Sequence, residues 1–245
     1  MTRYFQIINI RTFAVLIICL VTSFCVLHWQ IQYNFDLTII SIAIIFPLVF
    51  TIRAAFRRRE KALDHLSRFK AALLIVHGCF ERCKKLPDEK KLIIKEKLLA
   101  ISDSMIEYLS AGKNNQVALR ANLRFIFEFV QSNKEEVSSS EAFKILRFMK
   151  DVHTSVENTV AIFTHNTPVS LRAYCQIFIY VFPFIYAPAL LHRLDEGSPD
   201  WVVYALSLVT GFILISLYNV QDQMENPFDQ RGLDDIKVKD FKLEL

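Results

Sequence analysis

Glycine is scarce in this chain: only 5 of its 245 residues are glycine, and they do not form a phosphate-binding loop. The six histidines are scattered, and none pairs with another at the spacing of a metal site. The Gly-x-Ser-x-Gly pattern of a serine hydrolase is also missing. Five cysteines, an odd number, argue against a disulfide framework. We therefore expect no catalytic residues and do not expect an enzyme.

Charged residues are missing from four long stretches of the sequence: Thr12–Phe35, Leu37–Ile52, Ala173–His192 and Trp201–Gln221. A helix needs about 20 residues to cross the ~30 Å hydrocarbon core of a bilayer. Three stretches reach that length, and Phe56 with a snorkelling Arg53 can complete the second. We therefore predict an all-α membrane protein with four transmembrane helices. Because coupled transport usually needs a charged residue inside a span, a transporter is disfavoured.

Lysine and arginine are distributed unevenly around these stretches. Between Arg53 and Lys150 the sequence holds 21 Lys and Arg against 12 Asp and Glu, a local net charge of +9. The two opposite connections hold only Arg193 between them, whereas Arg3 and Arg11 precede the first stretch. The positive-inside rule places both termini and the central region in the cytoplasm, for a protein of an inner or plasma membrane. We assign the basic surface to topology and anionic lipid, and expect no nucleic acid partner.

The first stretch also has features of a signal peptide, because Arg3 and Arg11 precede an apolar run. No small-x-small cleavage site follows it, and Val26–Phe35 extends the run towards a full span. We therefore expect it to be retained as a transmembrane helix.

The region between the second and third spans repeats apolar residues at helical spacing. No helix breaker separates it from the second span before Pro87, so one helix is expected to leave the membrane and continue into the cytoplasm. Further helices are predicted over residues 89–110, 117–133 and 141–164, the last capped by Ser138–Glu141. A loop is predicted at 111–115. Pro183 and Pro188 are expected to kink the third span.

These features divide the chain into four parts along the sequence. We predict transmembrane helices 1 and 2 in residues 1–55, a cytoplasmic helical region in 56–167, transmembrane helices 3 and 4 in 168–221, and a cytoplasmic acidic tail in 222–245. The tail after Gln221 holds 7 acidic and 4 basic residues.

Ile42, Phe46 and Phe50 fall at i, i+4 and i+8 of the second span and therefore share one helix face. Pro47 lies between them and gives the helix a place to flex. Arg53 and Arg57 follow at the cytoplasmic end. Such an apolar stripe can pack against another helix or lipid, or it can line a pore. Spacing alone favours packing.

Three sets of residues resemble the bestrophin family. The family's tail signature is an acidic or Asn residue followed by Pro-Phe and a short loop. The tail of this chain is similar to it in Glu225-Asn226-Pro227-Phe228 and then in Asp234-Asp235-Ile236. The entry to the third span resembles the family's in Thr167-Pro168-Val169, Leu171, Ala173 and Tyr174. The second span and its exit resemble the family's in Ile42–Phe50, Ala55-Phe56, Arg58 and Ala62. The likeness covers both ends of the chain, while the middle is shorter and less similar.

The resemblance implies a homo-oligomeric, pentameric ion channel that usually conducts anions, with chloride as the favoured ion. In that family the second transmembrane helices line a central pore, and three apolar rings form its neck. The matching positions are Ile42, Phe46 and Phe50, and Arg53 and Arg57 would concentrate anions at the exit. A second constriction is expected near residues 140–143.

The resemblance also raises the question of calcium, because animal bestrophins hold it in the acidic tail. Arg231 lies inside the corresponding loop and disfavours a cation, so calcium is kept only as a candidate cofactor. The matching positions are Gln223, Asn226 and Asp234. The alternative function is a non-conducting membrane scaffold or sensor that binds a cytoplasmic partner. It predicts a monomer or dimer whose Ile42, Phe46 and Phe50 are buried against the protein's own other spans.

Overall fold

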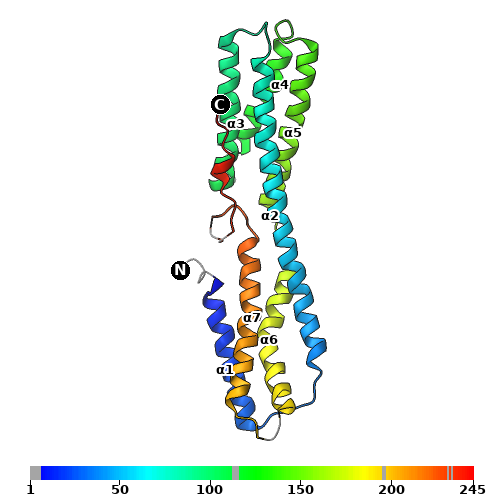
Figure 1. Ribbon diagram of the computed structural model, residues 1–245, viewed down its shortest axis with the longest axis vertical. Coiled ribbons are helices and arrows are strands. Elements are labelled where there is room, and N and C mark those ends of the chain that lie inside the picture. Colours follow the sequence, from blue (N-terminus) through cyan, green and yellow to red (C-terminus); the bar gives the residue numbers. More distant parts are fainter. Residues whose placement is uncertain (1–6, 112–115, 195–196, 231, 233) are drawn as a thin grey trace. The chain divides into compact units, whose positions relative to one another are not determined.

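The computed structural model describes residues 7–111, 116–194, 197–230, 232 and 234–245. Arg3, Arg231 and most of the loop predicted at 111–115 lie outside the described residues. The described chain is helical throughout, with no strand. Its elements are α1 (Ile10–Trp29), α2 (Leu37–Glu81), α3 (Asp88–Ala111), α4 (Gln116–Ser132), α5 (Ser139–Thr164), α6 (Val169–Arg193), α7 (Trp201–Met224) and the short 3₁₀ helix η3 (Val238–Phe241) (Figure 1).

Four of these helical segments are long and apolar enough to cross a membrane, which confirms the predicted all-α membrane protein. They lie in α1, in α2, within Ser139–Arg193 and in α7. Helix α2 is continuous for 45 residues, so the predicted extension beyond the second span is confirmed. The predicted helices 89–110, 117–133 and 141–164 correspond to α3, α4 and α5.

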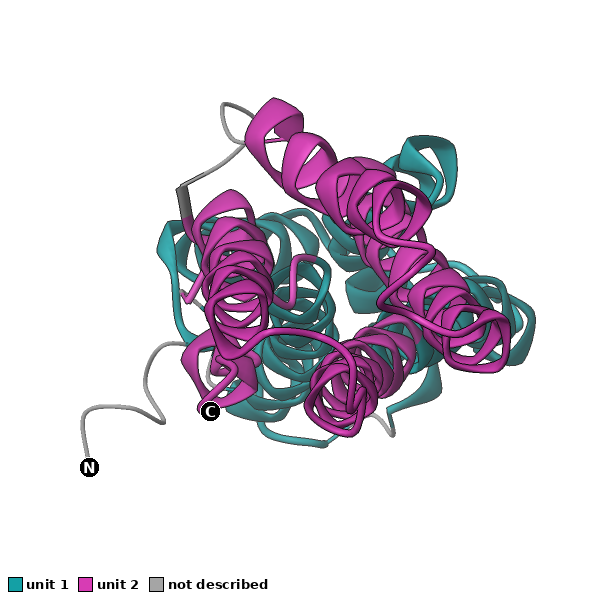
Figure 2. Ribbon diagram, turned by 90° about the horizontal axis from the view of Figure 1, so that it is seen from above, with its two compact units in different colours: residues 1–57, 166–225, 231–234 teal, residues 58–165, 226–230, 235–245 magenta. Residues whose placement is uncertain are grey.

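The chain forms two compact units, which Figure 2 colours separately. The first, here called the membrane unit, comprises residues 1–57, 166–225 and 231–234. The second, the helical unit, comprises residues 58–165, 226–230 and 235–245. Helix α2 contributes its first part to the membrane unit and the rest to the helical unit.

Helix α1 ends earlier than the sequence predicted. The uncharged run reaches Phe35, but the helix stops at Trp29, and Gln30 adopts the left-handed conformation with φ of 51°. The backbone N–H groups of Gln30 and Ile31 both donate to the carbonyl of Val26, which satisfies the last turn. Val26–Trp29 does extend the span, whereas the expected extension to Phe35 was wrong; the 20-residue helix is still long enough to cross a bilayer.

The last span also has a different end from the predicted one. Transmembrane helices 3 and 4 were predicted within residues 168–221, whereas helix α7 continues to Met224. The extra turn contains Asp222, and its polar side chains find partners within the membrane unit, as described below. Pro183 and Pro188 lie inside α6, as expected.

The membrane unit packs α1, α6 and α7 against one another (Figure 1). Close approach of α1 and α7 requires Gly211, because a Cβ built there would lie 2.6 Å from Cys19 Sγ. The apolar core between these helices also receives Ile44 and Leu48 from α2.

The helical unit has a larger apolar core, to which α2, α3, α4 and α5 all contribute. Helix α5 begins with the predicted capping box, in which Ser138 and Glu141 bond each other's backbone N–H groups. The end of the chain completes this core through four buried side chains: Phe228, Ile236, Val238 and Leu243. The tail is therefore part of the packing of this unit.

Candidate pore-lining site

The stripe on α2 is exposed in the single chain. Ile42, Phe46 and Phe50 are 52%, 58% and 55% exposed, whereas Ile44 and Leu48 on the opposite face are almost completely buried. The alternative hypothesis of a scaffold expected the stripe to be buried against the other spans. That expectation was wrong. The face must meet lipid or another chain, because large apolar side chains are rarely left in water.

The buried face of α2 explains why the stripe points outward. Thr51 is buried and its hydroxyl donates to the carbonyl of Leu48 over 2.8 Å, so this polar group needs no partner outside the helix. Ala55 continues the buried face further along α2. On the exposed face, the rings of Phe46 and Phe50 lie 5.8 Å apart between centroids at a tilt of 57°, so they support each other.

Two arginines continue the stripe beyond its apolar part. Arg53 follows Phe50 by three positions and Arg57 follows Arg53 by four, so helical geometry keeps both on the same face. Both are exposed. Arg58 differs, because its guanidinium donates to the carbonyl of Ile162 within the helical unit. The structure thus separates Arg53 and Arg57, which face away from the chain, from an arginine that fastens α2 to α5.

The exposed side of α2 is wider than the predicted stripe. Ile39, Ile45 and Val49 are also exposed, and on a helical projection they extend the apolar surface over about half of the circumference. A pore lining occupies only part of such a surface, and the remainder would contact lipid or a neighbouring helix. Assignment of the neck to Ile42, Phe46 and Phe50 therefore stays a prediction from the family resemblance.

The sequence did not predict that a buried carboxylate, that of Glu225, connects helices of the membrane unit. Glu225 is 3% exposed, and the same oxygen accepts hydrogen bonds from the backbone N–H and the hydroxyl of Thr167, over 3.1 and 2.6 Å. The other oxygen accepts from Arg172 Nη1 over 2.9 Å and from Gln221 Nε2 over 3.2 Å. This carboxylate joins the start of α6 to the end of α7.

A second polar contact of the same unit joins α7 to the start of α1. The buried amide of Asn219 donates to the carbonyl of Ile7 and to the hydroxyl of Thr12, both over 2.9 Å. The Asn9 side chain donates through Nδ2 to Asn219 Oδ1 over 3.0 Å. Arg11 lies 3.0 Å from Asp222, so charge is also balanced here. These contacts explain why α7 continues beyond its apolar run.

This cluster connects two of the motifs that carried the family resemblance. Thr167 belongs to the turn before the third span, and Glu225 belongs to the tail signature, 58 positions later. The sequence presented them as separate strings. The sequence suggested the contact only because both motifs occur in the same chain. It did not indicate which atoms of Thr167 and Glu225 form the hydrogen bond.

The candidate calcium ligands are placed as follows. Asn226 Oδ1 accepts from the backbone N–H of Phe228 over 3.4 Å, so it also supports the turn into the tail. Gln223 and Asp234 both belong to the membrane unit and have interactions of their own. Over the described residues, no three His, Cys, Asp or Glu side chains gather where they could hold a metal ion. Gln223 and Asn226 would contribute amide oxygens, and the ligand set stays a prediction.

The expected second constriction falls on the first turn of α5. Phe143 is 70% exposed there and lies in an open groove with Ala142 and Leu146, about 510 Å³ in volume. The groove belongs to the helical unit alone. Whether this turn meets a pore depends on neighbouring chains, so the constriction also stays a prediction.

Comparison with known proteins shows the fold. No family model matches the sequence, and no curated protein matches it. Among solved structures, a bacterial bestrophin homologue from Klebsiella pneumoniae, phased on zinc, superposes with a TM-score of 0.76 at 14% identity over 94% of this chain and 93% of that chain. A point variant of that homologue gives a TM-score of 0.74 at 15% identity over 94% of both chains. A variant of a membrane protein gives 0.78 at 14% identity over 95% of both. The chain has a bestrophin-like fold, which confirms the resemblance at that level.

Proposed function

We propose that this protein is the subunit of a homo-oligomeric ion channel, a pentamer in which α2 of each chain faces a central pore. The observation that supports it most directly is the exposed stripe of Ile42, Phe46 and Phe50 on a helix whose opposite face is buried. The bestrophin-like fold supports the same assignment, because the solved structures it resembles include a bacterial bestrophin homologue.

The proposed neck acts through the size and chemistry of its side chains. Five copies of Ile42, Phe46 and Phe50 would form three apolar rings, and narrow apolar rings gate conduction by losing their water. The edges of phenylalanine rings carry partial positive charge, which favours an anion at the constriction. Arg53 and Arg57 would raise the local concentration of anions at the cytoplasmic exit. We therefore propose chloride or another small anion as the conducted ion.

The sharpest test compares two sets of three alanine substitutions. Ile42, Phe46 and Phe50 are replaced together in the proposed neck. Phe13, Ile17 and Phe24 of α1 are replaced together in the control. The control set has the same composition and similar exposure, 58%, 59% and 59%.

In planar bilayers with asymmetric chloride, the neck variant should conduct severalfold more than the parent or lose its rectification. The α1 variant should behave like the parent. Equal behaviour of the two variants would overturn the neck assignment. The reversal potential of the parent reports anion against cation selectivity in the same recording.

Stoichiometry separates the channel from the alternative function. Native mass spectrometry of the detergent-solubilised protein should show five copies. A monomer or dimer would instead support the non-conducting scaffold or sensor that binds a cytoplasmic partner.

A further inference from the structure

Three prolines, Pro47, Pro183 and Pro188, lie inside membrane-spanning helices, and each leaves a backbone carbonyl without its helical donor. Pro47 of α2 cannot donate to the carbonyl of Ala43, and Pro188 of α6 cannot donate to that of Phe184. Within a bilayer no water is at hand to replace the lost bond, so an unpaired carbonyl is costly. Each of these carbonyls therefore calls for a donor from elsewhere in the protein.

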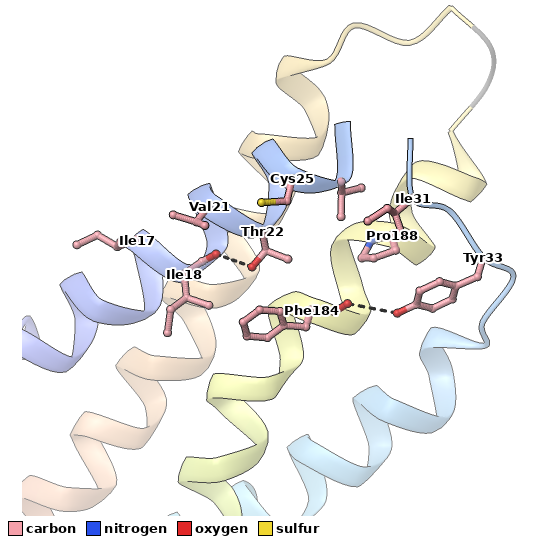
Figure 3. Close-up of a pocket in the computed structure, with 10 residues that line it drawn as sticks. Ile17, Ile18, Val21, Thr22, Cys25, Ile31, Tyr33, Phe184 and Pro188 are labelled. Atoms are coloured by element: carbon pink, nitrogen blue, oxygen red, sulfur yellow. Dashed lines mark hydrogen bonds between the residues drawn. The ribbon is translucent and has the colours of Figure 1, made fainter. Parts of the chain in front are cut away.

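The Ala43 and Phe184 carbonyls each receive that donor from a tyrosine hydroxyl of another segment. Tyr174 of α6 donates to the Ala43 carbonyl with its Oη at 3.4 Å. Tyr33, in the connection between α1 and α2, donates to the Phe184 carbonyl with its Oη at 3.2 Å. Figure 3 shows the second case, where Tyr33 points past Pro188 to the Phe184 carbonyl.

The Tyr174 ring is held in place by its own neighbours. Its centroid lies 4.4 Å from that of Phe178, one turn further along α6. Tyr174 is 37% exposed, and its hydroxyl contacts α2 at the Ala43 carbonyl. Ala43 lies directly after Ile42 and one turn before Pro47. The hydrogen bond therefore ties α6 to the turn of α2 in which the proposed neck begins.

We propose that Tyr174 is a positioning residue for the neck: its hydroxyl replaces the N–H that Pro47 lacks and stabilises the conformation of α2 seen here. The predicted effect on conduction rests on the proposed function, whereas the hydrogen bond itself does not depend on it. When α2 bends at Pro47, the Ala43 carbonyl moves relative to α6 and the bond is lost. Tyr33 plays the same structural role at Pro188, away from the neck, and provides a natural control.

A double-mutant cycle of Tyr174→Phe with Pro47→Ala tests the bond. Alanine at position 47 returns the missing N–H to the Ala43 carbonyl, so the tyrosine hydroxyl should then be redundant. Unfolding in detergent should show that Tyr174→Phe changes the unfolding equilibrium constant by about two- to tenfold when Pro47 is present. The change should vanish in the Pro47→Ala background. Equal effects in both backgrounds would overturn the proposal.

A second measurement covers the case in which Pro47→Ala does not assemble. With ¹³C at the Ala43 carbonyl, isotope-edited infrared spectroscopy should show its amide I band at higher frequency in Tyr174→Phe than in the parent. An unchanged band would show that the hydroxyl does not bond this carbonyl.

Conduction tests the consequence for the neck. Tyr174→Phe should change the ratio of conducting to non-conducting channels by about two- to tenfold, and Tyr33→Phe should leave it unchanged. If Tyr174→Phe alters unfolding but not this ratio, or if Tyr33→Phe alters it equally, the positioning role is wrong. If the parent protein does not conduct at all, the proposed channel function fails together with the positioning role, while the unfolding cycle still decides the hydrogen bond.

Discussion

Both units bury an apolar core, but the membrane unit and the helical unit expose different side chains on their surfaces. In the membrane unit, phenylalanines such as Phe13 and Phe24 are exposed, while Asn219 and Glu225 are buried. In the helical unit, Phe69 and Phe80 are buried, and charged side chains cover the surface. The surrounding medium accounts for the difference, because hydrocarbon accepts exposed apolar groups and water accepts exposed charge.

The informative residues of the two units therefore differ in kind. In the membrane unit they are buried polar groups, and Glu225 is satisfied by hydrogen bonds from three residues. In the helical unit they are the apolar side chains, most of them buried and a few, such as Phe143, exposed. Hydrogen bonding should dominate substitutions of the first kind, and apolar burial those in the core of the second unit.

Phe228 provides the largest expected effect, because the tail inserts it into the helical unit. Its side chain is completely buried and its ring centroid lies 6.0 Å from that of Phe163. Phe228→Ala should cost about 3–5 kcal/mol of unfolding free energy, through lost burial and the cavity that remains. Chemical unfolding followed by circular dichroism measures it. Phe143→Ala, an exposed phenylalanine of the same unit, should cost less than about 0.5 kcal/mol. Similar costs would mean that the tail does not belong to this core.

Glu225→Gln tests the contribution of a buried hydrogen-bonded carboxylate in the membrane unit. The expected loss of unfolding free energy is smaller than for Phe228→Ala. The substitution keeps the size of the side chain but removes the charge that Arg172 pairs with over 2.9 Å. Loss of a hydrogen bond to a charged group should cost about 1.5–3 kcal/mol, read from thermal unfolding in detergent. Glu157→Gln is the matched control, because Glu157 pairs with Arg120 on the exposed surface of the helical unit. That change should cost about 0–1 kcal/mol. A control as costly as Glu225→Gln would contradict the contrast between the two units.

Local features of the structure could be predicted from the sequence because they depend on neighbouring residues. The order of helices follows from apolar periodicity, and the start of α5 follows from Ser138 and Glu141 alone. The continuity of α2 beyond its span follows from the lack of a proline between Pro47 and Pro87. The end of α1 could not be placed in this way, because an uncharged run does not reveal the left-handed Gln30 that ends the helix.

Features that depend on distant residues were beyond the sequence. The bond from Thr167 to Glu225 joins positions 58 apart, and the bond from Asn9 to Asn219 joins positions 210 apart. Helical spacing placed Ile42, Phe46 and Phe50 on one face but did not say which face of α2 the chain covers. The structure of the single chain shows which face of α2 is covered. A neck would require several chains, so it belongs to the proposed function.

His153 offers the smallest effect and the clearest pH dependence in the helical unit. Its ring lies 5.2 Å from that of Phe127, and its Nε2 has no hydrogen-bond partner among the described residues. Burial lowers the pKa of His153 below its ordinary value of 6.5, against a smaller opposing effect of Glu157. The folded state therefore binds fewer protons than the unfolded state, and stability should fall as the pH drops below about 6.5.

Unfolding free energies between pH 8 and 5 should show this loss, and His153→Phe should reduce it. Burial also lowers the pKa of His65 in the same unit, so part of the dependence should remain until His65 is replaced as well. Phenylalanine also removes the unpaired buried nitrogen, so the variant should be no less stable than the parent at pH 8. An unchanged dependence in His153→Phe would mean that the imidazole is hydrated in the folded protein. The interior of the helical unit would then accommodate the polar imidazole of His153 together with water. The comparison with the membrane unit predicts that it excludes them.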